Sequence, residues 1–273
     1  MKINLTLFLT FFVVVSFGQL AADNTTPFSI GETVHFQSQV LGEERVLNVY
    51  LPLSYSGDSL QNYPVIYLLD GSADEDFIHV SGLVQFGSYS WINMVPESIV
   101  VGISNVDRKR DFTFPTSIAQ DKADFPTTGG SATFINCLSN EIIPLIEGKY
   151  RTTTEKSLIG QSLGGLLATE ILYEHTSLFD HYLIISPSLW WDNQSLLAKT
   201  TPTLSAEQSV FVAVGAEGKI MKRDAKELAK KLSGLKTNKS RVYFEYFPEQ
   251  DHGDVLHLAL YEGFESLFMK TEE

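Results

Sequence analysis

The sequence contains only one cysteine, Cys137, among its 273 residues. A lone cysteine has no partner within the chain, so disulfide bonds do not define this fold. The sequence also lacks an HExxH motif and any cluster of histidine and acidic residues at metal-ligand spacing. We therefore predict neither a metal nor another cofactor, and we expect Cys137 to pack on the apolar face of a helix.

Positive charge is scarce as well. Lys and Arg total 20 against 33 Asp and Glu, which gives a formal net charge of −13. Such a chain is a poor partner for nucleic acid or for an anionic membrane surface. The one basic cluster, residues 107–111, follows a predicted strand and contains Arg108 and Arg110. Each of these is a candidate for clamping an anionic substrate group, and an ion pair that fixes the loop to Asp107, Asp111 or another acid is the alternative.

An apolar run at residues 3–15 precedes the sequence Ser16-Phe17-Gly18. The run is short for a membrane span and is followed by small residues, which predicts a signal peptide over residues 1–18. An uncleaved anchor is the alternative, whereas the absence of a following cysteine argues against a lipoprotein. We expect an exported protein, periplasmic or secreted, with no stable membrane span once the leader is removed.

The rest of the chain, residues 27–273, shows no internal repeat and no low-complexity linker, and we expect one domain. Apolar strand patterns alternate with helical ones, and the first two strands follow each other directly. This order predicts an α/β fold with a mainly parallel sheet of about eight strands, helices on both faces and an antiparallel hairpin at its start. The expected strands are 33–40, 44–51, 65–70, 98–104, 157–161, 181–186, 209–215 and 241–247. The expected helices include 132–147 after a possible N-cap at Ser131, 225–232 and 255–269.

The segment 156–169, KSLIGQSLGGLLAT, reads as a strand, a tight turn and a helix with Ser162 at the apex. Gly160 and Gly164 remove Cβ atoms where the strand meets the helix, which allows a strained turn. This is the pattern of a nucleophile elbow. Ser162 is therefore the candidate nucleophile.

A serine nucleophile requires a histidine base and an orienting acid, both further along the chain. His252 lies in the loop between an apolar strand and the last predicted helix, and it is our candidate base. Glu217 follows the strand 209–215, at the end where an orienting carboxylate belongs. Asp224 is the alternative acid, although it better suits the start of a helix.

Acyl transfer also needs backbone donors for the oxyanion. The N–H of Leu163, directly after the nucleophile, is one candidate. The second is the N–H of Ser72 in the turn Asp70-Gly71-Ser72, where glycine permits a close approach of the backbone. An ordinary Asp-Gly-Ser turn is the alternative.

Together these motifs resemble the putative esterase family of α/β-hydrolases, which includes siderophore, feruloyl and acetyl-xylan esterases. The segments that carry the resemblance are YLLDG (67–71), DRKRDFT (107–113), EIIPLIE (141–147), GQSLGG (160–165), SPSLWW (186–191) and DHG (251–253). The segment 186–191 looks most like the siderophore-esterase branch. The resemblance implies Ser162, Glu217 and His252 as nucleophile, acid and base, with oxyanion donors at Leu163 and Ser72. Some members of that branch use a serine–histidine pair alone.

We therefore expect an exported serine esterase that hydrolyses a small-molecule or carbohydrate-linked ester through an acyl-enzyme. The alternatives are a catecholate trilactone siderophore esterase specifically, an acyltransferase of the same fold, and a non-catalytic binding module. We expect the segment 105–130, with Trp190 and Trp191, to form an aromatic substrate mouth. Such a mouth favours aryl esters over long alkyl chains. The sequence indicates neither the acyl and alcohol groups nor the oligomeric state.

Overall fold

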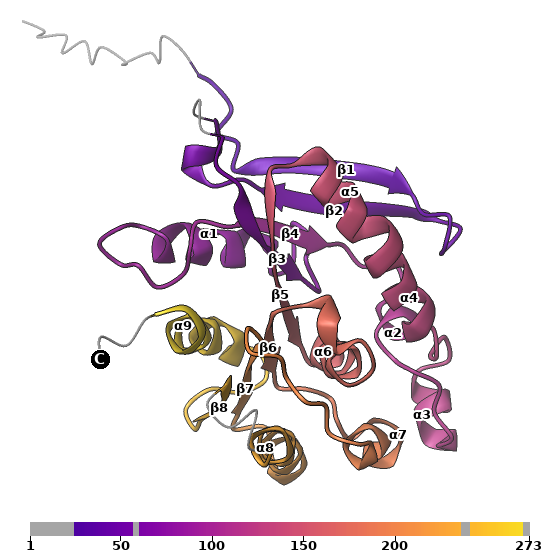
Figure 1. Cartoon of the computed structure of the whole chain (residues 1–273). Helices are drawn as coiled ribbons and strands as arrows, with labels where there is room; N and C mark the ends of the chain where they lie inside the picture. Colours follow the sequence, from indigo (N-terminus) through magenta and orange to yellow (C-terminus); the bar gives the residue numbers. More distant parts are fainter. Residues whose placement is uncertain (1–24, 57–59, 236–240, 270–273) are drawn as a thin grey trace, which may run out of the picture.

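The computed structural model describes residues 25–56, 60–235 and 241–269. The predicted signal peptide, residues 1–18, lies outside these ranges. Within them, the chain folds around one eight-stranded sheet with the strand order β1-β2-β4-β3-β5-β6-β7-β8 (Figure 1). The pairs β1–β2 and β2–β4 are antiparallel, and all the other neighbouring pairs are parallel. The predicted hairpin start and mainly parallel sheet are therefore confirmed.

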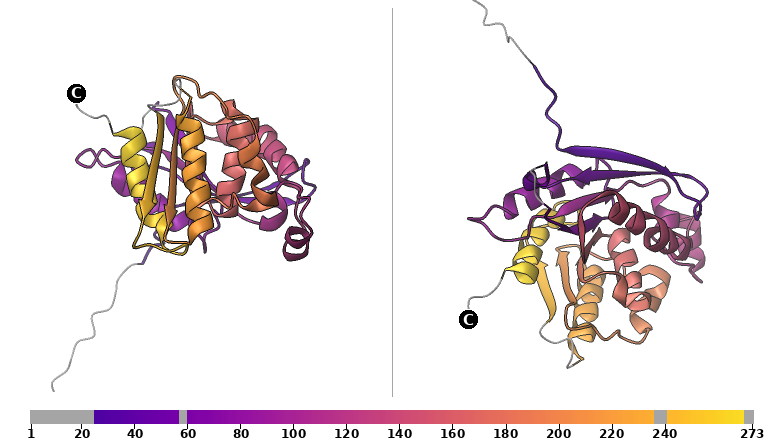
Figure 2. Two further views of the ribbon diagram at one scale, coloured as in Figure 1. Left: turned by 90° about the horizontal axis from the view of Figure 1, so that it is seen from below. Right: turned by 45° about the horizontal axis from the view of Figure 1, so that its top comes forward.

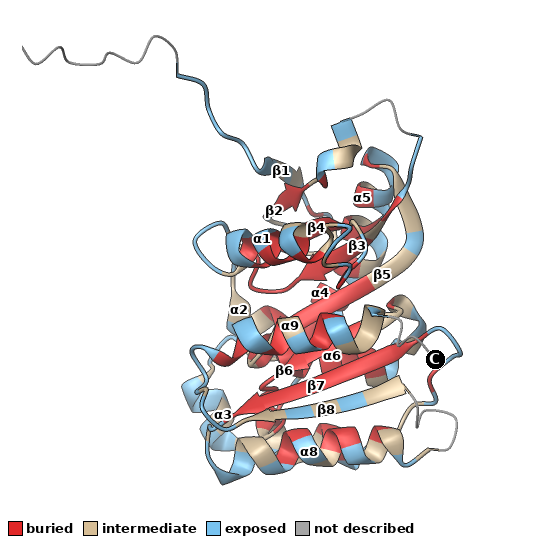
Figure 3. Ribbon diagram, turned by 90° about the vertical axis from the view of Figure 1, so that its left-hand side faces the viewer, coloured by how far each residue is buried: buried red, intermediate tan, exposed pale blue. Residues whose placement is uncertain are grey.

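The strands begin and end close to the positions expected from the apolar patterns. Their bounds are β1 Gly31–Gln37, β2 Glu44–Tyr50, β3 Tyr63–Leu68, β4 Ile99–Ile103, β5 Thr152–Gln161, β6 His181–Ile185, β7 Ser209–Gly215 and β8 Val242–Phe247. Every residue of β7 is buried because helices cover both of its faces, whereas the edge strand β1 is mostly exposed (Figure 3). Continuous apolar runs mark strands with two covered faces, which is why the inner strands were recognisable.

Helices cover the sheet in two layers, each with its own apolar core. The first layer consists of α1 (Phe77–Gly87) and α9 (Val255–Phe268), which lie together on one face (Figures 1 and 2). The main helices of the other layer are α4 (Ser131–Cys137), α5 (Ile143–Lys149), α6 (Leu163–Glu174) and α8 (Lys219–Ser233). Shorter elements are η1 (Leu53–Ser56), α2 (Arg108–Asp111), α3 (Ala119–Asp124), η3 (Thr176–Leu178), α7 (Trp191–Gln194) and η4 (Ser195–Ala198).

Two helix predictions need correction. The expected helix 132–147 is interrupted by a widened π-helical turn, η2 (Leu138–Ile142), directly before Pro144, which has no N–H to continue the ladder. Ser131 is the first residue of α4 and not its cap, since Gly130 occupies that position and the Ser131 hydroxyl bonds Glu170 instead. The expected helix 225–232 begins six residues earlier than predicted, at Lys219, so Asp224 lies inside it.

The parallel arrangement brings several loops to one edge of the sheet. The loops after β3, β4, β5, β6, β7 and β8 all leave from the carboxyl ends of their strands, which is where ligand sites form in open α/β sheets. These loops contain the residues that the sequence singles out.

Candidate active site

The turn between β5 and α6 has the backbone of a nucleophile elbow. Ser162 adopts φ 60° and ψ −118°, a conformation that non-glycine residues seldom take and that costs about 1–3 kcal/mol. The strand and helix approach so closely that a Cβ on Gly160 would lie 2.4 Å from the carbonyl oxygen of Gly164. The glycine at position 160 is therefore required by the packing, and the strained turn presents Ser162 at the carboxyl edge of the sheet.

Ser162 and His252 line one cavity of about 520 Å³. Its other lining residues are Ser188, Trp190, Glu217, Met221 and Asp251. The Ser188 hydroxyl lies 3.4 Å from the Ser162 hydroxyl, and the Gln161 side chain donates a 2.7 Å hydrogen bond to the carbonyl of His252. The histidine loop is thus tied to the residue directly before the serine.

His252 is oriented by Glu217, which follows β7. The Nδ1 atom of His252 donates a hydrogen bond to Oε2 of Glu217, and Oε1 of the same carboxylate accepts from the Ser186 hydroxyl. The backbone N–H of Gly215 also donates to Oε1, at 3.1 Å. The Glu217 side chain is 4% exposed and the His252 side chain 48% exposed. A buried acid therefore holds an accessible imidazole whose Nε2 is left for other partners.

The electrostatics of this pair suit a base and its acid. Burial raises the pKa of the Glu217 carboxyl, but hydrogen bonds from His252 and Ser186 outweigh it and hold the pKa below its ordinary value. The hydrogen bond to Glu217 raises the pKa of His252 above its ordinary value, against the opposing effect of partial burial. Glu217 is thus kept ionised beside His252, and it stabilises the protonated imidazole.

The loop after β3 lies beside the elbow. Asp70 takes a left-handed conformation at φ 56°, and both of its carboxylate oxygens accept hydrogen bonds from Arg108, at 2.6 and 2.8 Å. A further 3.4 Å contact joins Arg108 to the carbonyl of Gln161. The amide of Asn48 donates to the carbonyl of Gly71 at 2.9 Å. These bonds fix the loop of the candidate donor Ser72 relative to the elbow strand.

The two candidate oxyanion donors differ in their present partners. The Leu163 N–H belongs to the first turn of α6, and the described part of the chain offers it no hydrogen-bond acceptor. The Ser72 N–H donates to the carboxylate of Glu75 at 3.3 Å. One donor is available in the free protein, and the other is covered by an acidic side chain.

The sequence and the fold are similar to those of known proteins. The family model described as "Putative esterase" matches residues 38–254. The chain belongs to this esterase family. The crystal structure of an IroE-like serine hydrolase from Shewanella oneidensis is 31% identical, with a TM-score of 0.76, over 87% of this chain and 80% of that one.

Two further relatives are similar to this esterase over most of both chains. The crystal structure of the BES protein from Bacillus cereus is 27% identical, with a TM-score of 0.77, over 93% of this esterase and 100% of that chain. The ferri-bacillibactin esterase BesA of Bacillus subtilis is 27% identical over 237 residues, which cover 78% of this esterase and 82% of BesA. The predicted family and the α/β-hydrolase fold are confirmed.

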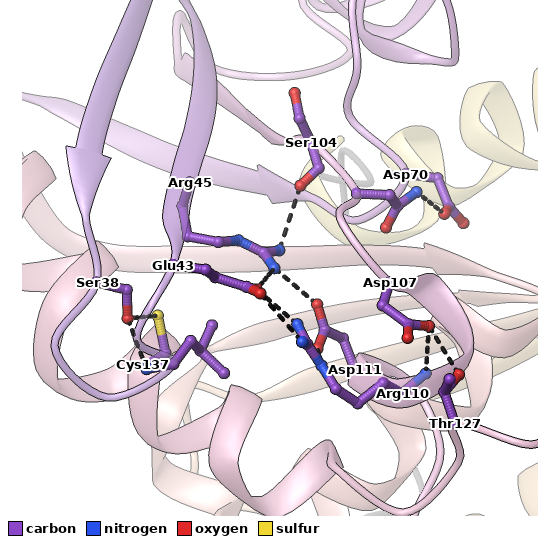
Figure 4. Close-up of polar contacts among 12 residues, drawn as sticks. Ser38, Glu43, Arg45, Asp70, Ser104, Asp107, Arg110, Asp111, Thr127 and Cys137 are labelled. Atoms are coloured by element: carbon purple, nitrogen blue, oxygen red, sulfur yellow. Dashed lines mark hydrogen bonds and ion pairs between the residues drawn. The ribbon is translucent and has the colours of Figure 1, made fainter.

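Of the two roles considered for Arg110, the structure shows the ion pair. The Arg110 guanidinium bonds Glu43 and Asp111 beside the buried side chain of Arg45 (Figure 4). Asp107 accepts from the Arg110 N–H and from Thr127, so the same cluster ties the two ends of the 107–127 loop together. Arg110 thus has the ion-pair role that was the alternative considered for it, and it lines neither hollow that contains Ser162.

The two tryptophans of the esterase lie in different environments. Trp190 lines the cavity with Ser162, whereas Trp191 is fully buried and its indole N–H donates to the carbonyl of Phe114 at 2.9 Å. Phe125 contacts both rings from the 105–130 segment. Trp191 therefore lies in the core, and its expected place on the cavity surface is corrected.

Asp224 and Arg108 both form ion pairs, which was the alternative considered for Arg108. Asp224 is buried inside α8 and pairs with Arg223, so the structure brings Glu217, and not Asp224, to His252. Arg108 reaches the edge of the site, where it lines a hollow of about 400 Å³ with Ser162 and His252, but Asp70 already binds its guanidinium. An unpaired clamp for an anion is therefore absent at Arg108.

Several residues around the site were not assigned a role from the sequence. Ser186 and Ser188 follow β6, and the rule that sites form at the carboxyl ends of parallel strands was the signal that could have found them. Met221 reaches the cavity only because α8 begins earlier than its apolar pattern indicates. Asn105 bridges Asp70 and Glu75, which no local sequence pattern reveals.

Neither a metal cluster nor a membrane helix occurs in residues 25–56, 60–235 and 241–269. In these ranges, no three His, Cys, Asp or Glu side chains are grouped so as to hold a metal ion. None of their helices has both the length and the apolar character needed to cross a membrane.

Proposed function

We propose that this esterase hydrolyses a carboxylic ester through an acyl-enzyme on Ser162, with His252 as general base and Glu217 as the orienting acid. The hydrogen bond from His252 Nδ1 to the buried Glu217 carboxylate is the observation that carries the proposal. It leaves Nε2 of an accessible imidazole as the proton acceptor, in the same cavity as a serine on a strained elbow.

The reaction takes place in two transfers. As the Ser162 hydroxyl attacks the carbonyl carbon, Nε2 of His252 accepts its proton, and the N–H groups of Leu163 and Ser72 bind the oxyanion. The C–O bond to the alcohol then breaks, and the imidazolium returns the proton to the leaving oxygen. In the second transfer a water molecule attacks the acyl-serine with the same base, which releases the carboxylic acid and restores the serine.

The substrate proposed for this site is a siderophore ester with aromatic groups. The proposal rests on the relatives, which include the ferri-bacillibactin esterase of Bacillus subtilis, and on the wall formed by Trp190. An aromatic wall beside the nucleophile suits a planar phenolic group better than a long alkyl chain. We further propose one esterase domain over residues 27–273 and export directed by residues 1–18, supported by the length and the leader pattern.

A hydrolysis panel tests the proposal. Purified protein lacking the leader is assayed with p-nitrophenyl acetate, butyrate and decanoate, methyl ferulate, acetylated xylan and a catecholate trilactone. We expect methyl ferulate and the catecholate trilactone, which carry phenolic groups, to be cleaved with higher kcat/KM than p-nitrophenyl decanoate, without inhibition by chelator. Ser162→Ala should lower kcat by about three to six orders of magnitude while leaving the fold intact. An unchanged rate in this variant contradicts the mechanism, and a preference for the decanoate contradicts the substrate class.

A further inference from the structure

The carboxylate of Glu75 lies in the hollow beside the nucleophile. This hollow of about 400 Å³ is lined by Ser162 and His252 together with Asp70, Glu75, Asp76, Arg108, Gln161 and Gly253. Within it, Oε2 of Glu75 accepts a 3.3 Å hydrogen bond from the backbone N–H of Ser72, the candidate oxyanion donor. An anionic oxygen therefore occupies this N–H in the free protein.

A second side chain holds Glu75 in this position. The amide of Asn105, which follows β4, donates to Asp70 at 2.7 Å and lies 3.2 and 3.3 Å from the two carboxylate oxygens of Glu75. Asn105 thus links Glu75 to the same Asp70 that Arg108 fixes against the elbow. The position of Glu75 is therefore supported by Asn105 as well as by the local turn.

The Ser72–Glu75 pair also has the spacing of a capping box, in which an acidic side chain three residues along bonds the N–H at the start of a helical segment. The backbone bond from Glu75 N–H to the Ser72 carbonyl, at 3.0 Å, belongs to that turn. Capping explains the contact with Ser72. It does not explain why the carboxylate lines the hollow of the nucleophile and is held there by Asn105.

The wall around Glu75 carries negative charge. Three carboxylates, those of Asp70, Glu75 and Asp76, line this hollow with one guanidinium, that of Arg108, which is paired with Asp70. Burial, followed by the nearby charges of Asp70 and Glu75, raises the pKa of Asp76 to about 6. A substrate that enters on this side meets an anionic surface.

We propose that Glu75 is a specificity-determining residue of the esterase: its carboxylate covers the Ser72 N–H until a substrate carbonyl displaces it, and its charge disfavours anionic esters. This inference rests on the proposed function, because the Ser72 N–H matters only as an oxyanion donor. Displacing one exposed hydrogen bond is a modest barrier, whereas a like charge close to the substrate acts on every anionic ester.

Two variants separate the contact from the charge. Glu75→Gln keeps an oxygen that can accept from Ser72 but removes the charge, and Glu75→Ala removes both. Asp74→Asn is the matched control, since Asp74 is exposed, adjacent and not a lining residue of the hollow. The substrates are p-nitrophenyl butyrate, which is neutral, and mono-p-nitrophenyl glutarate, which carries a carboxylate.

We expect Glu75→Gln to raise the ratio of kcat/KM for the anionic ester to that for the neutral ester by about five- to tenfold. Glu75→Ala should in addition raise kcat/KM for the neutral ester by about two- to tenfold. It should also strengthen inhibition by benzeneboronic acid, whose tetrahedral serine adduct needs the uncovered N–H. Asp74→Asn should change none of these quantities.

Other outcomes overturn the inference. If both Glu75 variants keep the wild-type charge preference, Glu75 does not determine specificity. If Glu75→Ala lowers kcat/KM for the neutral ester and weakens boronate inhibition, the carboxylate only holds the loop. If the melting temperature falls in Glu75→Ala alone, that variant has lost the cap. The ratio of kcat/KM for the anionic and neutral esters in Glu75→Gln then tests the effect of the charge. If wild-type protein cleaves no ester, or Ser162→Ala cleaves esters equally well, the proposed function itself fails.

Discussion

Glu217 and His252 share a hydrogen bond although 35 positions separate them in the chain. They meet because β7 and β8 are parallel neighbours, so that the loops after both strands leave the sheet at the same edge. The contact joins a buried carboxylate to an accessible imidazole. The identity of the acid, the protonation of the base and the packing of the elbow can each be tested separately.

The first prediction distinguishes the two candidate acids. Glu217→Gln should lower kcat by about ten- to ten-thousandfold, because orientation of His252 and charge stabilisation are lost while nucleophile and base remain. Asp224→Asn should leave kcat near the wild-type value, because Asp224 pairs with Arg223 inside α8. Steady-state kinetics with p-nitrophenyl butyrate measure both. If kcat falls strongly in Asp224→Asn and is unchanged in Glu217→Gln, Asp224 and not Glu217 is the acid.

The second prediction concerns pH. His252 acts as a base only when neutral, so kcat/KM should rise with pH through the pKa of His252 in the free enzyme. The hydrogen bond to Glu217 raises that pKa above its ordinary value, so this acid limb should lie at a correspondingly higher pH. Glu217→Gln removes the stabilising charge and should move the limb to lower pH.

Asp251→Asn is the control for this pH profile. Asp251 also raises the pKa of His252 through its charge, but its contribution is smaller than that of Glu217. Profiles of kcat/KM from about pH 5 to 9 should therefore show a smaller downward shift for Asp251→Asn than for Glu217→Gln. An acid limb that stays in place in Glu217→Gln would mean that a group other than His252 titrates.

The third prediction compares two glycines. Gly160→Ala should destabilise the protein and reduce activity, because the new Cβ would lie 2.4 Å from the backbone oxygen of Gly164 and push α6 away from β5. Gly82→Ala, in the middle of α1 with nothing within 4 Å of the new Cβ, should stabilise the fold by about 0.5–1 kcal/mol. Urea unfolding measures both effects, and equal changes in the two variants would argue against the elbow packing.

The fourth prediction concerns the ion-pair cluster of Arg45. The side chains of Arg45 and Asp111 are 0% and 1% exposed, and their atoms Nη1 and Oδ2 lie 2.7 Å apart (Figure 4). Asp111→Ala should lower the free energy of unfolding by about 3–5 kcal/mol, because it leaves a buried guanidinium poorly compensated.

Arg110→Ala tests the same cluster at its rim. The Arg110 side chain is 30% exposed, so its loss should cost only about 1 kcal/mol or less in unfolding free energy. The KM for an anionic ester should not change, since Arg110 does not line the cavity of Ser162. A large rise in the KM for an anionic ester in Arg110→Ala would show that Arg110 contacts the substrate.

The sequence by itself predicted the mainly parallel sheet, the elbow and the location of the histidine loop. These features have local causes: buried strands need continuous apolar residues, and a tight turn between β5 and α6 needs glycine at position 160. A prediction succeeds where the requirement is satisfied within a few neighbouring residues. The widened turn η2 before Pro144 shows the limit, because the apolar pattern continues through it unchanged.

Only the tertiary structure decided which charged and aromatic side chains meet. Glu217 and Asp224 lie close together in the sequence, but only Glu217 lies at the loop that faces His252. Trp190 and Trp191 are adjacent, yet one lines the cavity and the other is buried against Phe114. These outcomes depend on the strand order and on where each helix begins, which are set by packing between segments far apart in the chain, and a local pattern contains no record of such contacts.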